Sequence, residues 1–470
     1  MDTPLAASIS ATNTVFLATP ATRRVTTLTT ITPSWPLIRV PNQNHRNKSF
    51  SLFLTHCSAK PDTDTDNAKD QNSTVGPDPN PSLQNPAKPT SNQAPTSSNS
   101  SFSRGLVFDL GPKNSWDGAE IGSPVVKRYL GDEEERWHMW YHGRSSDIPG
   151  SDSIGLAVSS NGIHWERGAG PVQSGGDVGL VLNCSKDWWA FDTHSIRPCE
   201  VVVMSSTKIR ANSAVYWLYY TGYISERAEV SANLSEFSLE NPERVNTGLS
   251  EDKVSKSLPG LAMSQDGRHW ARIEGEHHTG ALLDVGSDGE WDSMFIASPQ
   301  VVFHGSGDLR MYYHSFDVEK GHFAIGMARS RDGLRWLKLG KIVGGGARGG
   351  FDEFGAMNAR VVRNRKDGKY VMAYEGVAAD GRRSIGMAVS ADGLKDWRRL
   401  QAGPVLKCCE EDGWDNEGVG SPCLVQMDGE ADEWRLYYRG VGKGGQTGIG
   451  MAVSEGSESR SFIRWMGFQL

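Results

Sequence analysis

The chain has 470 residues and a formal net charge of −7, from 49 Lys and Arg against 56 Asp and Glu. This acidic balance leaves no basic face for nucleic acid, so no nucleic-acid partner is expected, and no apolar run approaches membrane-spanning length, so no membrane span is predicted. The six cysteines show no Cys-x-x-Cys spacing, and Cys57 lies outside the predicted folded region, which leaves an odd number. We therefore expect no disulfide framework, no metal site and no cofactor.

The first hundred residues differ in composition from the rest. Residues 1–60 contain six Lys or Arg and one acidic residue, Asp2, among many Ser and Thr, which is typical of an organellar transit peptide. The predicted destination is the chloroplast, with the mitochondrion as the alternative, because Arg23 and Arg24 lie in a Thr-rich stretch and not in a clearly amphipathic one. Residues 61–104 are rich in Pro, Asn, Ser, Thr and Asp, with almost nothing to bury, and are predicted to form a disordered linker.

Between residues 105 and 470 a sequence repeat with three parts occurs five times. The first part is an aromatic residue and an aspartate that lead into an apolar stretch, at Trp116-Asp117, Phe191-Asp192, Trp291-Asp292, Phe351-Asp352 and Trp414-Asp415. The second part is a short aromatic run whose alternation is typical of a half-buried strand: WHMWYHG, YWLYYTG, LRMYYHS, YVMAYEG and WRLYYRG. The third part is a hairpin such as IGMARSRDGLRW, whose Asp-Gly pair suits a tight turn.

The spacing of this repeat predicts the architecture. Successive aspartates are 75, 100, 60 and 63 residues apart, and each interval holds about four short strands without helical periodicity. Four-stranded units repeated five times are typical of propeller blades, so the predicted fold class is all-β: a five-bladed β-propeller preceded by a disordered N-terminal extension. The predicted blades are residues 105–172, 188–273, 290–340, 350–400 and 413–470. An array of separate small domains is the alternative, which we disfavour because a 60-residue unit buries too little surface to fold alone.

Residues shared by all repeats are assigned to the scaffold. The Ser-x-Asp-Gly turns, which begin at Ser159, Ser264, Ser330 and Ser390, and the five shared aspartates fit turn and capping roles. One insertion departs from the repeat: about 35 polar residues lie between Tyr223 and Leu258. This insertion is interpreted either as a functional lid or as a disordered excursion.

Positions where the repeats differ are the candidates for function. In an antiparallel blade the start of the first strand and the end of the second share one face, here called the funnel face. On it we place His142, Thr221, His314, Glu375 and Arg439 after the aromatic runs, then Glu120, His194, Arg197, Phe295, Glu353, Arg360 and Glu417 in the first strands, with Arg144 and Asp317 beside them. For any one of these residues, the alternative is a polar side chain on a solvent-exposed rim that has no function. Carboxylates, histidines and arginines at one mouth favour a ligand site, because propellers bind ligands where their blades meet.

The motifs WD-x-x-x-x-GSP-x-V, W/L-R-M/L-YY-x-G and IG-M/L-A-x-S-x-DG-x-x-W resemble the five-bladed propellers of the glycoside hydrolases. They are similar to the arabinanase, levansucrase and invertase superfamily, which includes glycoside hydrolase families 43, 32, 68 and 130. The resemblance covers residues 105–470 and is carried by scaffold motifs. It implies that carboxylates from the inner strands of the first three blades perform the chemistry.

Carried over residue by residue, the resemblance implies that Glu120 and Asp192 act as base, nucleophile or tuning carboxylates. The third blade departs from the family pattern, because FIASPQVV has no carboxylate where the acid is expected, and Glu375 is assigned as the acid instead. The substrate-binding set is His142, Arg144, His194, Arg197, His314, Asp317, Glu353, Arg360, Glu417 and Arg439.

The predicted function is cleavage of a glycosidic bond in a small-molecule or oligosaccharide substrate by carboxylate acid/base chemistry. Hydrolysis and phosphorolysis are both open, because Arg197, Arg360 and Arg439 would suit a phosphate. One alternative is a non-catalytic propeller, a pseudo-glycosidase that binds a glycan, a metabolite or a protein partner. Another is chemistry on a non-glycoside metabolite.

Overall fold

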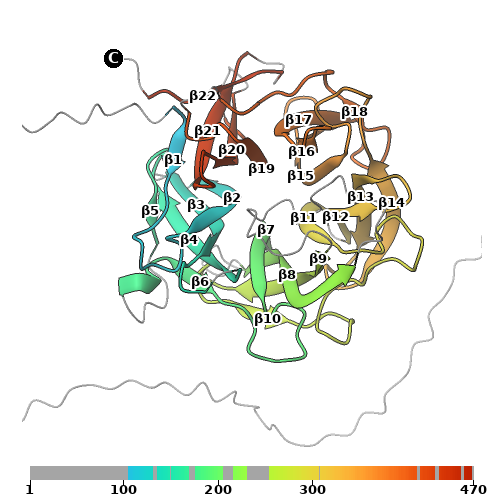
Figure 1. The fold of residues 1–470 in the computed structure, drawn as a ribbon, viewed down its shortest axis with the longest axis horizontal. Helices are drawn as coiled ribbons and strands as arrows, with labels where there is room; N and C mark the ends of the chain where they lie inside the picture. The colour runs from blue at the N-terminus through green and yellow to red at the C-terminus, as the bar shows by residue number, and fades with distance from the viewer. Residues whose placement is uncertain are drawn as a thin grey trace, which may run out of the picture. The chain divides into compact units, whose positions relative to one another are not determined.

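The computed structural model describes residues 104–130, 135–148, 150–168, 175–204, 215–229, 253–305, 307–409, 413–428, 433–456 and 460–467. The predicted transit peptide and nearly all of the predicted linker lie outside these residues. Within the described ranges the chain forms twenty-two β-strands in five antiparallel sheets and one short 3-10 helix, η1 (Gly175–Asp177). The protein is a five-bladed β-propeller, as the repeat predicts (Figure 1).

Each blade is one sheet whose strands follow chain order from the axis outward. Blade one contains β2 (Glu120–Leu130), β3 (Glu135–Arg144), β4 (Asp152–Ser159), β5 (Glu166–Arg167) and β6 (Leu180–Leu182). Blade two contains β7 (Ser195–Met204), β8 (Val215–Glu229), β9 (Lys253–Ser264) and β10 (Ala271–Ile273). Blade three contains β11 (Ala297–Gly305), β12 (Asp308–Asp317), β13 (His322–Ser330) and β14 (Trp336–Val343). Blade four contains β15 (Ala356–Arg363), β16 (Tyr370–Val377), β17 (Arg383–Ser390) and β18 (Arg398–Arg399).

The fifth blade closes the ring with both ends of the propeller sequence. It contains β19 (Gly418–Gln426), β20 (Trp434–Val441), β21 (Thr447–Ser454) and β22 (Phe462–Arg464), and β1 (Leu106–Phe108) also pairs with β21. Residues 106–108 therefore belong to blade five and not to blade one, where the predicted boundary at residue 105 placed them. Pairing the first strand with the last blade joins the two ends of the ring, which leaves no open edge between blades one and five.

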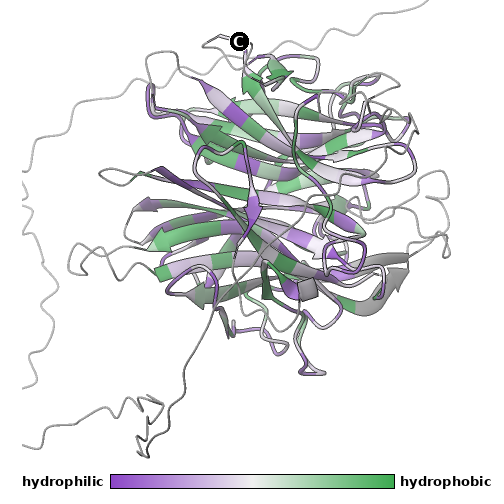
Figure 2. Ribbon diagram, turned by 90° about the vertical axis from the view of Figure 1, so that its left-hand side faces the viewer, coloured by the Kyte–Doolittle hydropathy of each residue, from purple (hydrophilic) through white to green (hydrophobic). Residues whose placement is uncertain are grey.

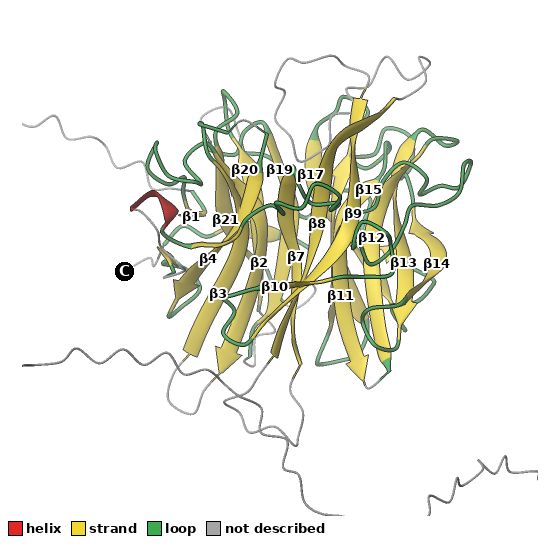
Figure 3. Cartoon of the chain, turned by 90° about the horizontal axis from the view of Figure 1, so that it is seen from below, coloured by secondary structure: helices red, strands yellow, loops and turns green. Residues whose placement is uncertain are grey.

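The hydrophobic core lies between blades. Each of the five contacts between neighbouring blades holds one cluster of buried apolar side chains. Between blades one and five, for example, Trp137 and Tyr141 pack with Tyr437 and Met451. Consecutive residues of a strand point to opposite faces of the blade, and strands such as β12 are buried along nearly their whole length, so both faces pack against neighbouring blades. Figure 2 shows hydrophobic residues distributed along the strands of the ring. The strands run side by side through the thickness of the ring (Figure 3), so residues of equal register form layers around the axis.

The five shared aspartates make the same buried contacts in every blade. Each accepts a hydrogen bond of 2.8–2.9 Å from a tyrosine of the second strand, and these are Tyr141, Tyr220, Tyr313, Tyr374 and Tyr438. Each also pairs with a cation of the fourth or outermost strand, at Arg167, Arg272, Lys338, Arg399 and Arg464. The aspartates therefore join the first, second and outer strands of a blade, which confirms their assignment to the scaffold.

The Ser-x-Asp-Gly turns are structural as well. In the turn at Ser159 the serine Oγ accepts the Gly162 N–H at 2.9 Å, and the Asn161 side chain accepts the Ile163 N–H at 2.9 Å. Gly162 has a φ of 72°, which explains the preference for glycine there. The turn in blade two keeps the same bonds with Ser264 and Asp266.

The polar insertion of blade two begins and ends as a two-stranded ribbon. β8 and β9 continue beyond the sheet, with Arg227 opposite Ser255 and Glu229 opposite Lys253. Residues 230–252 of this insertion, predicted to be either a lid or a disordered excursion, lie outside the described part of the chain.

Candidate functional site

All five inner strands contain an irregularity at the same height. The pairing of the first strand with the second shifts after Gly122, Pro198, Ala297, Met357 and Gly420. At four of these bulges a non-glycine residue has positive φ: Ser123 (47°), Ser298 (52°), Asn358 (50°) and Ser421 (46°). Left-handed backbone at a non-glycine residue costs energy and is concentrated at functional sites. The Ser-Pro pairs of blades one, three and five mark these bulges in the sequence.

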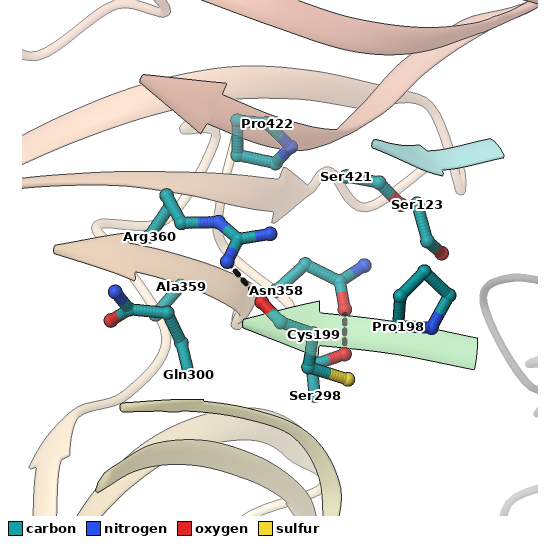
Figure 4. Close-up of a pocket in the computed structure, with 10 residues that line it drawn as sticks. All are labelled: Ser123, Pro198, Cys199, Ser298, Gln300, Asn358, Ala359, Arg360, Ser421 and Pro422. Carbon is teal, nitrogen blue, oxygen red and sulfur yellow. Dashed lines mark hydrogen bonds between the residues drawn. The ribbon is translucent and has the colours of Figure 1, made fainter. Parts of the chain in front are cut away.

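The bulges line a small cavity on the axis, here called the axial pocket. Its volume is about 20 Å³, enough for a water molecule or a small polar group. Its walls are Ser123, Pro198, Cys199, Ser298, Gln300, Asn358, Ala359, Arg360, Ser421 and Pro422 (Figure 4). Every blade contributes at least one of these residues. The Ser298 hydroxyl donates to Asn358 Oδ1 at 2.6 Å, and the Ser123 hydroxyl has no partner among the described residues. The pocket is therefore polar, and a ligand could take up at least one of its hydroxyl groups.

The layer on the funnel side of the bulges holds the divergent residues. Register places His142 opposite Gly122 and Arg439 opposite Gly420 in two of the blades. Thr221, His314 and Glu375 occupy the same level opposite Arg197, Ala297 and Met357. One position of the repeat thus carries four kinds of side chain around one axis, with histidine in two blades, and all five residues are buried.

Glu120 is the centre of an ion-pair network in this layer. Its carboxylate lies 2.6 Å from Arg144 Nη1, 2.9 Å from Arg439 Nη2 and 3.6 Å from His142 Nε2. Burial by itself would raise the pKa of Glu120, but Arg439, His142 and Arg144 outweigh burial and lower the pKa to about 2. Burial and the Arg197 charge lower the pKa of His142. Glu120 is therefore an anion at neutral pH and cannot donate a proton.

A second buried carboxylate, Asp152, was not among the predicted site residues. Its two oxygens accept from Arg144 Nε at 2.6 Å and from Arg197 Nε at 2.7 Å. Burial opposes ionisation, yet Arg197 and Arg144 hold the pKa of Asp152 well below its ordinary value. One sequence signal could have found it. Asp152 stands two residues before Ile154, where the other repeats have Ser257, Phe323, Arg383 and Thr447, none of them acidic.

Together these groups form a cationic cluster, defined here as Glu120, Asp152, Arg144, Arg197 and Arg439. Three guanidinium groups face two carboxylates, which leaves an excess of one positive charge. All five residues are at most 7% exposed.

Glu375 occupies a different environment, beside the axial pocket. Its Oε2 accepts from Asn358 Nδ2 and from the Ser421 N–H, both at 2.8 Å, while Arg383 lies 3.7 Å from Oε1. Asn358, another residue absent from the prediction, also receives the Ser298 hydroxyl, and its N–H donates to His314 Nδ1 at 3.3 Å. Two groups that hold Glu375, Asn358 and Ser421, are pocket walls. The carboxyl group is thus fixed directly behind the pocket surface.

Gly420 makes room for this carboxylate. A Cβ atom at residue 420 would overlap the Glu375 carboxyl group, and the end of the Glu375 side chain would have to move away from its present hydrogen bonds. We expect Gly420→Ala to displace Glu375 and to lower any turnover at least tenfold, measured with the substrate found for the wild type. Gly418→Ala is the matched control because nothing lies near its Cβ position, and equal activities of both variants would contradict the proximity inferred for residue 420.

Several predicted site residues lie away from this layer. Asp192 accepts from Tyr220 and Arg272 like the other shared aspartates, so its predicted catalytic role is corrected to a scaffold role. Asp317 pairs with Lys341 at 2.6 Å and caps the β12–β13 turn. Glu353 accepts the Gly349 N–H within its own turn. Glu417 is exposed at the start of β19, and His194 is half-buried beside Gly150. The predicted substrate contacts of these last four residues are not supported by the geometry.

If Asp192 belongs to the scaffold, it should behave like its counterpart Asp292. We expect Asp192→Asn and Asp292→Asn each to lower the free energy of unfolding by about 1–3 kcal/mol, because each leaves a buried tyrosine and a partly exposed cation without an anion. Denaturant titration measures this change. Turnover per folded molecule should stay within about threefold of the wild type in both variants, and a selective loss in Asp192→Asn would restore its catalytic assignment.

Arg360 closes the pocket on the side away from the funnel. Its guanidinium contacts the Cys199 carbonyl oxygen across the axis (Figure 4) and lies 3.2 Å from Glu200 Oε2. Gln300 Nε2 donates to the same oxygen of Glu200 at 2.8 Å. Arg360, Glu200 and Gln300 therefore form a floor, here called the axial plug. Glu200 and Gln300 were not predicted from the sequence.

No set of three His, Cys, Asp or Glu side chains in the described ranges is arranged to hold a metal ion. None of the described residues forms a helix long and apolar enough to cross a membrane.

The chain was compared with protein families and with curated proteins. No family model matches the chain. Two uncharacterized proteins from strains of Mycobacterium tuberculosis are each 29% identical to it, over 359 and 356 residues, which cover 75% of this chain and 98% of theirs.

Among solved structures, a protein described as a glycoside hydrolase aligns over 76% of this chain and 92% of its own, with a TM-score of 0.51 at 16% identity. An N-acetylgalactosamine deacetylase from F. plautii, in complex with a blood group B trisaccharide, aligns with a TM-score of 0.49 at 13% identity, over 76% and 96% of the two chains. A structure reported for the family 130 mannoside phosphorylases and glycoside hydrolases aligns with a TM-score of 0.43 at 15% identity, over 77% and 96%. The protein has a glycoside-hydrolase-like five-bladed propeller fold. The resemblance inferred from its motifs is therefore confirmed for the fold.

Proposed function

We propose that this protein is a carbohydrate-active enzyme that cleaves a glycosidic bond in the funnel, on the side of the axial pocket where Glu375 lies. The observation that carries the proposal is the position of Glu375, a buried carboxyl group fixed behind the pocket wall by Asn358 and the Ser421 N–H. The glycoside-hydrolase-like fold supports it. Cleavage of a glycosidic bond needs a proton for the leaving oxygen. Glu375 is the carboxyl group of the layer whose arginine contact, 3.7 Å to Arg383, is longer than those of Glu120 and Asp152.

The cationic cluster would then bind the substrate and would not donate a proton to it. Glu120 and Asp152 are held as anions by their arginines, so their role is to orient Arg144, Arg197 and Arg439. The excess positive charge of the cluster suits an anionic group through charge-assisted hydrogen bonds. This favours phosphorolysis over hydrolysis, because phosphate would supply the attacking group that the layer otherwise lacks.

A substrate screen tests this proposal. The full chain is incubated with a panel of aryl glycosides and oligosaccharides of defined linkage, with and without inorganic phosphate, and the products are separated by chromatography with mass detection. We expect release of a sugar phosphate that depends on phosphate. Free sugar released at equal rates in both conditions would indicate hydrolysis, and no product from any substrate would refute the proposal.

The same network also favours a second candidate, a non-catalytic propeller that binds a glycan or metabolite. The family pattern would use Glu120 as a catalytic carboxylate, but Glu120 forms ion pairs with Arg144 and Arg439. The corresponding position of blade three has no carboxylate. Saturable binding of an oligosaccharide in calorimetry, without product and unchanged in Glu375→Gln, would establish this function instead.

We also propose chloroplast import, from the basic, Ser- and Thr-rich composition of residues 1–60. A fluorescent protein fused behind residues 1–104 should accumulate in plastids of leaf cells. Mitochondrial or diffuse fluorescence would refute this location.

A further inference from the structure

The channel continues below the axial plug into a second cavity. This cavity, here called the lower chamber, is formed by the halves of the five inner strands that follow the bulges, so it opens opposite the funnel face. Its volume is about 390 Å³, which is within the range of small-molecule sites. The axial pocket and the lower chamber share Gln300 and Arg360, so the axial plug separates the two cavities.

The walls of the lower chamber are apolar. The lining includes Val203 of blade two, Phe303 of blade three and Val362 of blade four, whereas Val201 and Leu424, which also border the cavity, are buried in the cores between blades. Phe303 is 48% exposed and Val203 36% exposed, so these apolar surfaces face solvent. Exposed apolar surface inside a concavity is typical of a ligand site.

The floor and the rim of this chamber are positively charged. Glu200 lies in the floor between two cations, Lys127 and Arg360, and pairs with both. At the rim, Arg128 is neutralised by Glu135 and Asp428, whereas Arg363 donates to the Gly368 carbonyl oxygen and has no carboxylate partner among the described residues. Three cations (Lys127, Arg360, Arg363) against one carboxylate leave two positive charges. The buried hydroxyl of Tyr129, another lining residue, has no hydrogen-bond partner in the described structure.

We propose that the lower chamber binds a small organic anion with an apolar body, such as an aromatic or branched-chain carboxylate or sulfonate. The valine and phenylalanine walls would cover the apolar body. The charge excess of Lys127, Arg360 and Arg363 would bind the anionic group, and Tyr129 would donate a hydrogen bond. This site does not depend on the proposed glycoside chemistry, because it lies on the other side of the axial plug.

The test uses anilinonaphthalene sulfonate as the probe, with its uncharged relative N-phenyl-naphthylamine beside it. For the full chain we expect saturable binding of one sulfonate, measured by fluorescence and calorimetry, and at least about fivefold weaker binding of the uncharged probe. Val203→Asp and Arg363→Glu each place negative charge at the mouth, and should weaken sulfonate binding by roughly fivefold or more.

Matched controls separate the chamber from the general surface. Leu130→Asp adds the same charge at a neighbouring exposed apolar residue outside the chamber lining, and Arg398→Glu reverses an exposed arginine of β18. Both should bind the probe like the wild type. The proposal is overturned by non-saturable binding, by equal affinity for the two probes, or by equal weakening in test and control variants. All four substitutions are at surface-exposed side chains, and circular dichroism verifies that each variant is folded.

Discussion

Glu375→Gln should reduce turnover by about 10²–10⁴-fold while the substrate dissociation constant changes little. A general acid contributes an effect of this size. Glutamine is isosteric, and its carbonyl oxygen can still accept the Asn358 amide and the Ser421 N–H. The variant therefore keeps its fold and its pocket walls and loses the carboxyl group that would transfer a proton. Steady-state kinetics with the substrate identified in the screen, together with calorimetry for binding, measure the two quantities separately.

Glu353→Gln is the matched control for this substitution. Glu353 lies in the same blade and on the same face, but its carboxylate accepts the Gly349 N–H within a turn and is partly exposed. We expect turnover of this variant within about twofold of the wild type. Full activity of Glu375→Gln would show that Glu375 is not the proton donor, and equal losses in both variants would point to a general effect of substitution on this face.

The fold could be predicted from the sequence because its determinants are local and repeated. An aromatic-aspartate pair, an alternating aromatic run and a Ser-x-Asp-Gly hairpin each specify a strand or turn within about ten residues. Five copies of this sequence repeat then predict a closed five-bladed propeller. The pairing of β1 with β21 was not predicted because Leu106–Phe108 contains none of the repeated motifs. The contact also joins residues more than 340 positions apart.

The candidate site was predicted only in part, because its members are defined by what they face across the axis. The divergent position that holds His142 and Glu375 could be found by aligning the repeats. Asp152 could have been found in the same way, because the other repeats have no acidic residue at its position. Glu200 and Asn358 could not, since single polar residues in strands have no sequence signal that distinguishes an axial side chain from a solvated one. For Asp192 the family pattern predicts catalysis, whereas the contacts with Tyr220 and Arg272 favour a scaffold role, and these contacts could not be inferred from the sequence because they come from other strands.

Glu120→Gln should lower the free energy of unfolding at neutral pH by about 3–5 kcal/mol, because it leaves Arg144 and Arg439 buried without their anion. The pH dependence gives the sharper test. The pKa of Glu120 falls from 4.5 to about 2 on folding, so between these values the unfolded chain binds more protons than the folded one. The stability from Glu120 is therefore complete above about pH 4.5 and is lost as the pH falls through about 2, a change of about 3 kcal/mol.

The difference in stability between wild type and Glu120→Gln should thus be greatest at neutral pH and should shrink steadily from about pH 4.5 towards pH 2. Denaturant titrations at a series of pH values measure it, and Asp152, although also ionised by its arginines, is present in both proteins and does not mask the difference. Glu417→Gln, at an exposed carboxylate, should leave stability within about 0.5 kcal/mol at every pH. If the gap between wild type and Glu120→Gln were constant with pH, the substitution would act through packing, and the arginines would not be what keeps Glu120 ionised.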